Sequence, residues 1–249
     1  MATDAAAAGP GAPVPTCPRW TTTDLVRHQG MVHRWAAAHL QGLKGNRPEV
    51  IAKEARTSAP EDFDALLGWL ADGAAALVAA AEAAPDDLSA MRFLADPPPA
   101  RQFWARRQAH ETTIHRVDAL AARSGRVPTV DDIAALDIVP ALASDGIDEL
   151  LTGFLPRGSS RLRLDRAAVL SVRPDDAPLR WTVHVSAGPP VTRRWSATDP
   201  PETPDAVVAG SSVGLYVGLW NRGGDLAYSG GAASEVASAW RRAVRVRWS

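Results

Sequence analysis

The sequence has little of several features that mark whole classes of protein. It holds one cysteine in 249 residues, Cys17, which excludes a disulfide framework and a cage of thiolate metal ligands. The 27 basic and 28 acidic residues give a formal net charge of −1, so no overall field favours nucleic acid or an anionic membrane. No apolar run of 18 residues is evident, which argues against a membrane-spanning helix. We therefore expect neither nucleic acid nor membrane as a partner, and any bound metal must be held by histidines and carboxylates.

The composition changes along the chain and divides it into three parts. Residues 1–19 lack the basic start and leucine-rich run of a secretory signal, and we interpret them as a disordered leader on a cytoplasmic protein. Residues 20–156 are rich in Ala and Leu with helical patterning, whereas residues 157–249 carry Val, Thr, Trp and Gly at strand-like spacing. The predicted fold class is an all-α domain over 20–156 followed by a small α+β domain over 157–249.

Helix start and stop signals predict a helical bundle in the first domain. Hydroxyls and an acidic residue near position 20 start a helix that runs to about 40, and a capping-box pattern at 58–61 starts another that runs to about 84. A third helix covers about 100–123 and ends at Gly125, and a further helical stretch follows over 129–154. These elements amount to four or more helices in a bundle.

The second domain shows short strand signals and two helical ones. We predict strands and helices at these positions: strands at 161–164, 168–172, 180–185, 192–195 and 244–248, with helices at about 206–220 and 232–242.

The third helix contains the motif His-Glu-Thr-Thr-Ile-His over 110–115. Four helical steps rotate by about 400°, so Glu111 and His115 project from nearly the same face and can chelate one ion. His110 and His115 are five residues apart and point in different directions, so this is not the two-histidine zincin arrangement. A Glu-x-x-x-His pair is more commonly a surface ion pair than a metal site, and its spacing alone does not choose between the two.

A third ligand would have to come from the first helix, where His28, His33 and His39 are candidates. His28 and His39 share the inward-facing stripe, whereas we expect His33 to be turned away. Three protein ligands leave an open position, as a catalytic zinc site requires. The alternative for His28 is a core histidine with its hydrogen bonds satisfied.

Four segments in order resemble one protein family. They are WTTTDLVRH at 20–28, WARRQAHETTIHRVD at 104–118, DGIDEL at 145–150 and VVAGSSVGLYVGLWNR at 207–222. With their spacing, they resemble the mycothiol-dependent maleylpyruvate isomerase family over nearly the whole chain from Trp20 onward.

The resemblance implies a fold and a set of site residues. It implies a DinB-like four-helix bundle that binds a divalent metal, zinc above all, through His28, Glu111 and His115, and a C-terminal domain similar to sterol-carrier folds. The usual residue after the first histidine is Leu, and this chain has Gln29 instead, so local packing is expected to differ. Arg222 matches the basic residue of the family's Leu-Trp-x-Arg segment and is the expected catalytic residue, binding a substrate carboxylate.

The resemblance also implies a reaction class. The thiol of mycothiol, as thiolate, would attack a small electrophilic substrate, either for cis–trans isomerisation of maleylpyruvate or for thiol S-transfer. The alternatives are a non-catalytic protein in which a metal braces the bundle and a small ligand is bound, and a metal-free helical scaffold.

Overall fold

The computed structural model describes residues 1–196, 199, 202–223 and 226–245, and these form two compact units. The first unit comprises residues 1–93 and 97–127, and the second comprises residues 94–96 and 128–249. The first is helical and the second combines helices with a sheet, which confirms the predicted fold class. The division comes earlier than the expected boundary at 156, because the helical stretch after Thr129 packs within the second unit.

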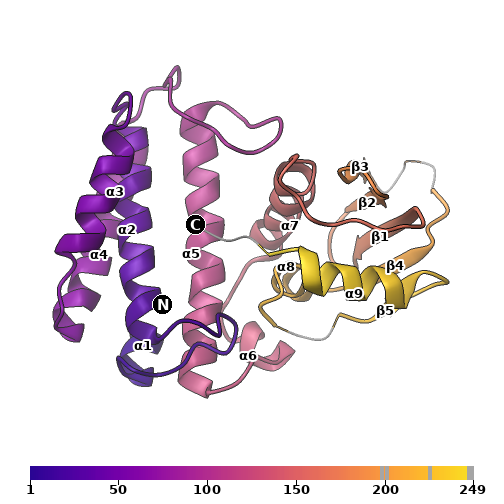
Figure 1. Ribbon diagram of the computed structural model, residues 1–249, viewed down its shortest axis with the longest axis horizontal. Coiled ribbons are helices and arrows are strands. Elements are labelled where there is room, and N and C mark those ends of the chain that lie inside the picture. Colours follow the sequence, from indigo (N-terminus) through magenta and orange to yellow (C-terminus); the bar gives the residue numbers. More distant parts are fainter. Residues whose placement is uncertain (197–198, 200–201, 224–225, 246–249) are drawn as a thin grey trace. The chain divides into compact units, whose positions relative to one another are not determined.

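Four long helices make up most of the first unit. The central helix α2 (Thr22–Leu40) packs against α3 (Arg47–Ser58), α4 (Phe63–Ala83) and α5 (Ala100–Ser124) (Figure 1). Of these, α3 is not among the predicted helices. All three neighbours contribute to the surroundings of α2, so this helix is buried on more than one side.

The ends of α2 and α5 follow the predicted signals. Thr21 caps α2, and its side chain and that of Asp24 form a reciprocal capping box. Gly125 ends α5 in the left-handed conformation at φ 67°, which glycine adopts without steric cost. The second predicted helix starts later than expected, because Asp62 and not Ser58 is its cap and accepts a hydrogen bond from the Ala65 amide at 2.8 Å.

Helix α4 is a long apolar helix, contrary to the expectation that the chain has no such stretch. It is long and apolar enough by length and composition to cross a membrane, and 28% of its apolar window is buried. Its buried residues Leu66 and Leu70 pack in one cluster with Val26 of α2. The outer face owes its apolar character to small residues, mostly alanines.

The N-terminal residues are folded, where a disordered leader was expected. Helix α1 (Ala2–Ala8) packs on α5, and Asp4 forms an ion pair with Arg123 at 2.7 Å. Ala5 and Val14 are fully buried. The segment is ordered because its small apolar side chains pack against residues of α2, α4 and α5. Most of these residues are distant in the sequence.

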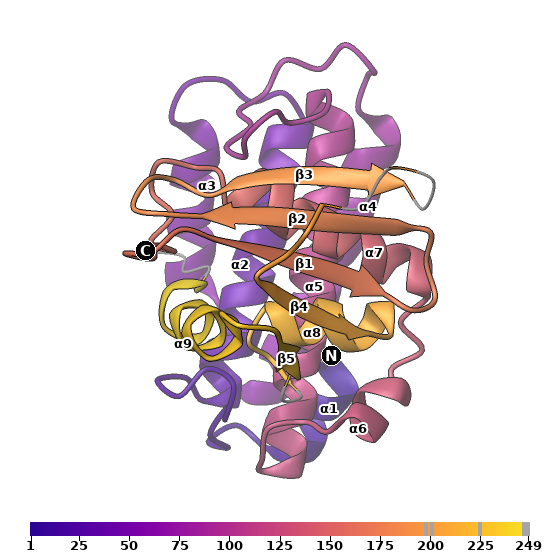
Figure 2. The same ribbon diagram turned by 90° about the vertical axis from the view of Figure 1, so that its right-hand side faces the viewer.

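The second unit contains a five-stranded sheet in the order β3-β2-β1-β4-β5 (Figure 2). Its strands are β1 (Ala168–Pro174), β2 (Leu179–Val185), β3 (Val191–Ser196), β4 (Ala206–Gly210) and β5 (Tyr228–Ser229). Strand β1 pairs in parallel with β4, and the other neighbours are antiparallel. The strands predicted near 168, 180 and 192 are confirmed.

Three predictions for this unit differ from the structure. Residues 161–164 form no strand. The helix predicted over 206–220 is instead β4 followed by α8 (Ser212–Leu219), because Val207 and its neighbours pair with β1 before Ser211 caps the helix. Of the predicted strand 244–248, Val244 and Arg245 are not in a strand, and the remainder lies outside the described residues.

Helices complete the second unit on one face of the sheet and at its edge. They are α6 (Val130–Ala134), α7 (Pro140–Asp148) with the π-helical turn Glu149–Phe154, α8, and α9 (Ala233–Ala243), the last close to the predicted 232–242. Helices α7 and α8 pack on each other and lie on one face of the sheet (Figures 1 and 2).

Candidate metal centre

Helices α2 and α5 bring His28, Glu111 and His115 together within the first unit. The Nε2 atom of His28 lies 3.5 Å from Oε1 of Glu111, and Nε2 of His115 lies 3.2 Å from the same oxygen. One ligand atom from each residue lies within 4.8 Å of the other two. Three donors at this spacing can converge on one divalent cation, as the motif and the first-helix histidine predict.

The cluster is buried, and burial has different effects on its three members. Side-chain exposure is 9% for His28, 4% for Glu111 and 6% for His115. Burial lowers the pKa of His28 despite its hydrogen bond with Glu111. Burial alone would raise the pKa of Glu111, but hydrogen bonds with both histidines and the Arg107 charge hold it well below its ordinary value. Glu111 is therefore ionised and His28 neutral, the states in which both bind metal.

His115 is the member that is protonated on both ring nitrogens, and so positively charged, at neutral pH in the metal-free protein. Burial would lower its pKa, yet hydrogen bonds with Asp118 and Glu111 and the charges of both carboxylates raise it to about 9. Its two ring nitrogens have separate roles, since Nε2 faces Glu111 and Nδ1 lies 2.8 Å from Oδ2 of Asp118. A metal at Nε2 would replace that proton, while Nδ1–H could still donate to Asp118.

Two buried charged residues next to the cluster were not among the predicted site residues. Arg107 is fully buried, and its Nη2 donates to Oε2 of Glu111 at 2.7 Å, one helical turn away. Asp118 is fully buried one turn beyond His115. Both could have been found from their i−4 and i+3 spacing to the ligand residues, because these positions share a helix face. They fix the carboxylate and one imidazole in place.

An indole covers one side of the cluster. The Trp20 ring lies 4.7 Å from the ring centroid of His28 and 5.7 Å from that of His115, and it is stacked on the latter at 29°. Trp20 precedes the capped start of α2, so the cap places the ring and His28 together.

The other candidate histidines of α2 lie elsewhere. The prediction that His33 is turned away from the core is wrong, because it is 2% exposed and its Nε2 lies 2.8 Å from the Gln29 amide and 3.1 Å from Oγ1 of Thr112. Gln29, the departure from the expected Leu, thus pairs with a histidine inside the bundle. His39 is also buried, but it stacks on Trp104 with ring centroids 4.4 Å apart.

Arg222 belongs to the second unit and follows α8. It is partly buried, and its Nη1 donates to the Trp220 carbonyl at 3.1 Å. The Trp220 ring in turn packs edge-on against Phe154 at 5.5 Å. The catalytic role of Arg222 remains a prediction.

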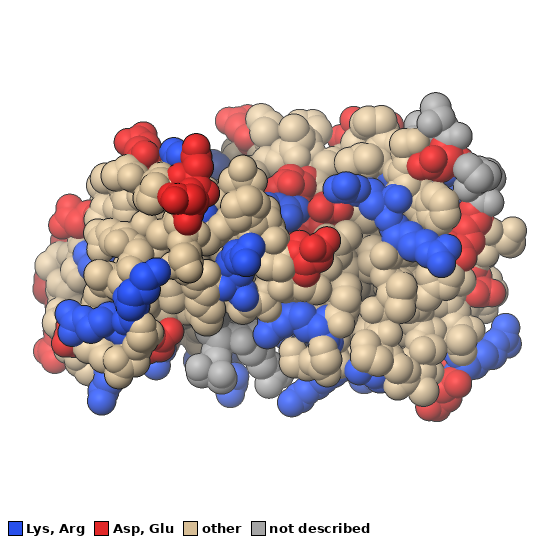
Figure 3. Space-filling model, turned by 90° about the horizontal axis from the view of Figure 1, so that it is seen from above, with Lys and Arg blue, Asp and Glu red and all other residues tan. Residues whose placement is uncertain are grey.

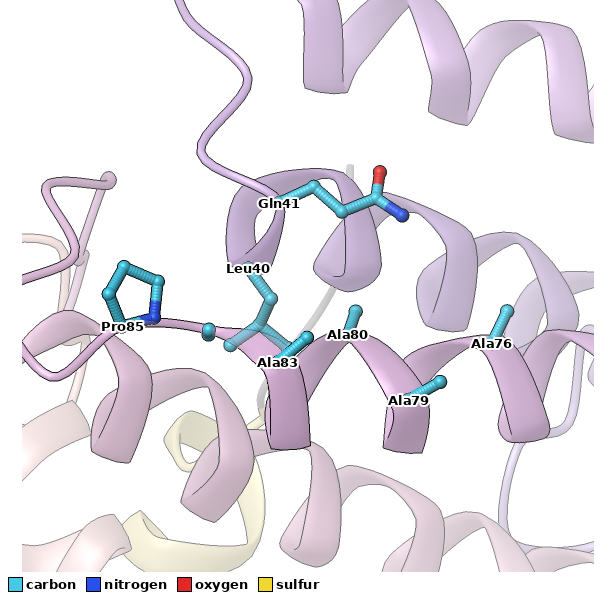
Figure 4. Close-up of a pocket in the computed structure, with 8 residues that line it drawn as sticks. Leu40, Gln41, Ala76, Ala79, Ala80, Ala83 and Pro85 are labelled. Carbon is cyan, nitrogen blue, oxygen red and sulfur yellow. The ribbon is translucent and has the colours of Figure 1, made fainter.

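The surface offers two further observations. A groove lined mainly by alanines lies at the C-terminal ends of α2 and α4, where Leu40, Gln41 and Pro85 meet Ala80 and Ala83 (Figure 4). No residue lining it is titratable, and twelve residues of α2, or about 18 Å, separate Leu40 from His28. Basic and acidic side chains are interspersed on the face seen in Figure 3, in keeping with a net charge of −1. Neither feature competes with the cluster as a chemical site.

Comparisons with known proteins point to one family. Residues 1–120 match the family model of the mycothiol maleylpyruvate isomerase N-terminal domain. The fold resembles the crystal structures of the mycothiol-dependent maleylpyruvate isomerase and of a mutant of that enzyme, each with a TM-score of 0.55. Sequence identities are 17% and 15%, and each comparison covers 92% of this chain and 86% of the other. No curated protein matches the sequence.

Proposed function

We propose that this chain, whose residues 1–120 match the family model of the mycothiol maleylpyruvate isomerase N-terminal domain, is a metal- and mycothiol-dependent enzyme of that family. The observation that carries the proposal is the buried cluster of His28, Glu111 and His115. The reaction proposed first is cis–trans isomerisation of maleylpyruvate or a similar unsaturated acid. Thiol S-transfer to an electrophile shares the addition step and differs in whether the thiol leaves again.

The donor set fits a divalent metal of the zinc type. Two imidazoles and one carboxylate suit zinc and several other divalent ions, and zinc is the metal we propose. Among the described residues the cluster offers three candidate ligands, so a four-coordinate ion would keep one position for a thiol or water. This count disfavours the non-catalytic alternative, since a structural zinc site is normally closed by four protein ligands.

The chain's own residues would prepare that site. When bound, the metal would favour the ionised form of the mycothiol thiol, which adds to an activated double bond and is released again after rotation. Glu111 supplies the negative charge that balances the metal, and Arg107 orients its second oxygen. Asp118 accepts from His115 Nδ1 and so leaves Nε2 as the ligand atom.

We further propose that Arg222 binds a carboxylate of the substrate. A guanidinium presents donors in a planar fork that matches a carboxylate, which a lysine ammonium cannot reproduce. The cytoplasmic location predicted from the sequence is part of the same proposal.

The test is an assay of the zinc-loaded protein with mycothiol and maleylpyruvate. We expect thiol-dependent isomerisation that is lost in His28→Ala and kept in His184→Ala, a histidine outside the cluster that pairs with Glu202 at 3.0 Å. Arg222→Lys should lower kcat/KM by about 10–100-fold, the effect of losing a charge-assisted hydrogen bond. Accumulation of a thiol adduct in place of the trans isomer would identify S-transfer. Activity without thiol, or undiminished in His28→Ala, would contradict the proposal.

A further inference from the structure

Residues 12–21, which precede α2, form a folded segment that we name the N-terminal clasp. Its two ends are bridged at Pro13 and Thr21, and the Val14 amide donates to the Trp20 carbonyl at 3.0 Å. Two tight turns between them are closed by the Cys17 and Trp20 amides, each at 2.8 Å. Val14 is fully buried in a cluster with Leu25 of α2 and two alanines of α5. The clasp is therefore anchored to both helices that carry the cluster.

The tip of the clasp reaches Asp118 with two side chains. Thr16 Oγ1 donates to Oδ1 of Asp118 at 2.5 Å, and Cys17 Sγ donates to Oδ2 at 3.5 Å. The same Oδ2 lies 2.8 Å from Nδ1 of His115. The carboxylate thus has one oxygen held by the clasp and the other shared between the clasp and the histidine.

By holding the Asp118 carboxylate, the clasp also restrains the His115 ring. The nitrogen of a ligand histidine that does not bind metal usually donates to an acceptor, and this bond fixes the tautomer and the ring orientation. Asp118 can serve as that acceptor only if its own plane is fixed, and Thr16 fixes it from a position 102 residues away in the sequence. Trp20, at the end of the clasp, also stacks on the His115 ring.

We infer that the N-terminal clasp sets the metal affinity of the cluster, because Thr16 positions Asp118 and Asp118 positions His115. The inference rests on the proposed function, since it presumes that His28, Glu111 and His115 bind metal. Thr16 and Asp118 act here as positioning residues, and neither would contact the ion or the substrate.

The experiment compares metal binding by variants of the full chain. Metal-free protein is titrated with Zn²⁺ against a chelator, and Co²⁺ is added separately so that its visible spectrum reports the ligand geometry. Thr16→Val removes the donor at nearly constant shape, Thr16→Ala does so with less steric demand, and Thr16→Ser keeps the donor. The matched control is Thr23→Val, which removes a hydrogen bond between the start of α2 and the residues just before the clasp, from Thr23 Oγ1 to the Pro10 carbonyl at 2.8 Å, without touching Asp118.

We expect Thr16→Val and Thr16→Ala to weaken Zn²⁺ binding about 3–10-fold and to shift the Co²⁺ spectrum. This is less than the 10–100-fold typical of removing a direct partner of a ligand, because Thr16 acts through Asp118. Thr16→Ser and Thr23→Val should stay within about twofold of the wild type, with unchanged spectra.

Three results would overturn the inference in different ways. Wild-type affinity and spectrum in both Thr16→Val and Thr16→Ala would remove the clasp's role and leave the metal site standing. An equal loss in Thr23→Val would assign the effect to general loosening of the contact between the N-terminal residues and α2. Failure of the wild type to bind Zn²⁺ or Co²⁺ would remove the proposed metal site and the inference together.

Discussion

Two histidines on one stripe of α2 have different surroundings, and the comparison shows that an inward-facing position does not by itself determine whether a histidine can bind metal. His28 and His39 are three turns apart, and both face α5. His28 meets the buried carboxylate of Glu111 and a second imidazole. His39 instead stacks on the Trp104 indole at 10° between planes, and the carboxylate beside it, that of Glu49 at 4.0 Å, is exposed. The helical period therefore selects which side chains face inward, and the opposing residue decides between chemistry and packing.

The largest effect is expected from changing Glu111, the buried carboxylate beside His28. Glu111→Gln keeps the shape but removes the charge that faces Arg107 and two histidines inside the unit. We expect loss of metal binding and a fall of roughly 3 kcal/mol in the free energy of unfolding, because the buried Arg107 charge loses its acidic partner. The difference in the free energy of unfolding is measured by denaturant unfolding of the metal-free variant and the metal-free wild type. A variant as stable as the wild type would show that the pair adds nothing to stability.

The pH dependence of metal binding gives the next largest effect. The pKa of His115 is raised to about 9 in the metal-free protein, so at neutral pH a proton must leave before metal binds. Affinity for Zn²⁺ should rise about tenfold per pH unit between pH 6 and 8 and level off above the His115 pKa. Calorimetry in buffers of different ionisation enthalpy should show release of close to one proton at pH 7. A pH-independent affinity would contradict the assigned state of His115.

The same shift has the opposite effect on the stability of the metal-free protein. Because its folded pKa lies above the ordinary 6.5, His115 contributes stability that is complete below about pH 6.5 and is lost as the pH rises through about 9. The pKa of Glu111 is lowered, so its contribution is present above pH 4.5 and is lost in acid. Unfolding of the metal-free protein at several pH values, with His115→Gln as the control, separates the two contributions.

The smallest effect sharpens the comparison from the other end. His39→Phe keeps the aromatic stacking on Trp104, so we expect less than about 1.5 kcal/mol change in stability and metal affinity within twofold of the wild type. His28→Phe is the matched substitution and should abolish metal binding. Metal loss in His39→Phe would show that the two histidines are not functionally separate.

Local signals accounted for much of the site. The capping box at Thr21 fixed the start of α2, Gly125 fixed the end of α5, and the four-residue spacing placed Glu111 and His115 on one face. Spacing could not choose between His28 and His39, and the family resemblance made that choice.

What the sequence did not reveal depends on contacts between distant residues. The first 19 residues look like a disordered leader because they lack a helical stripe, yet Thr16 contacts Asp118 and Val14 packs on α5. His33 was expected to face outward because a stripe model assumes one buried face, whereas α2 packs against α3, α4 and α5 and also contacts α1. Strand β4 was predicted as helix because its parallel partner β1 lies more than thirty residues away.

Metal content is the most direct test of the account. Protein purified without a metal-affinity tag is analysed by mass spectrometry, as wild type and as His28→Ala and His115→Ala. The account predicts one equivalent of a divalent metal in the wild type and little in either variant. A wild type that contains no metal, even after zinc is added back, would contradict it.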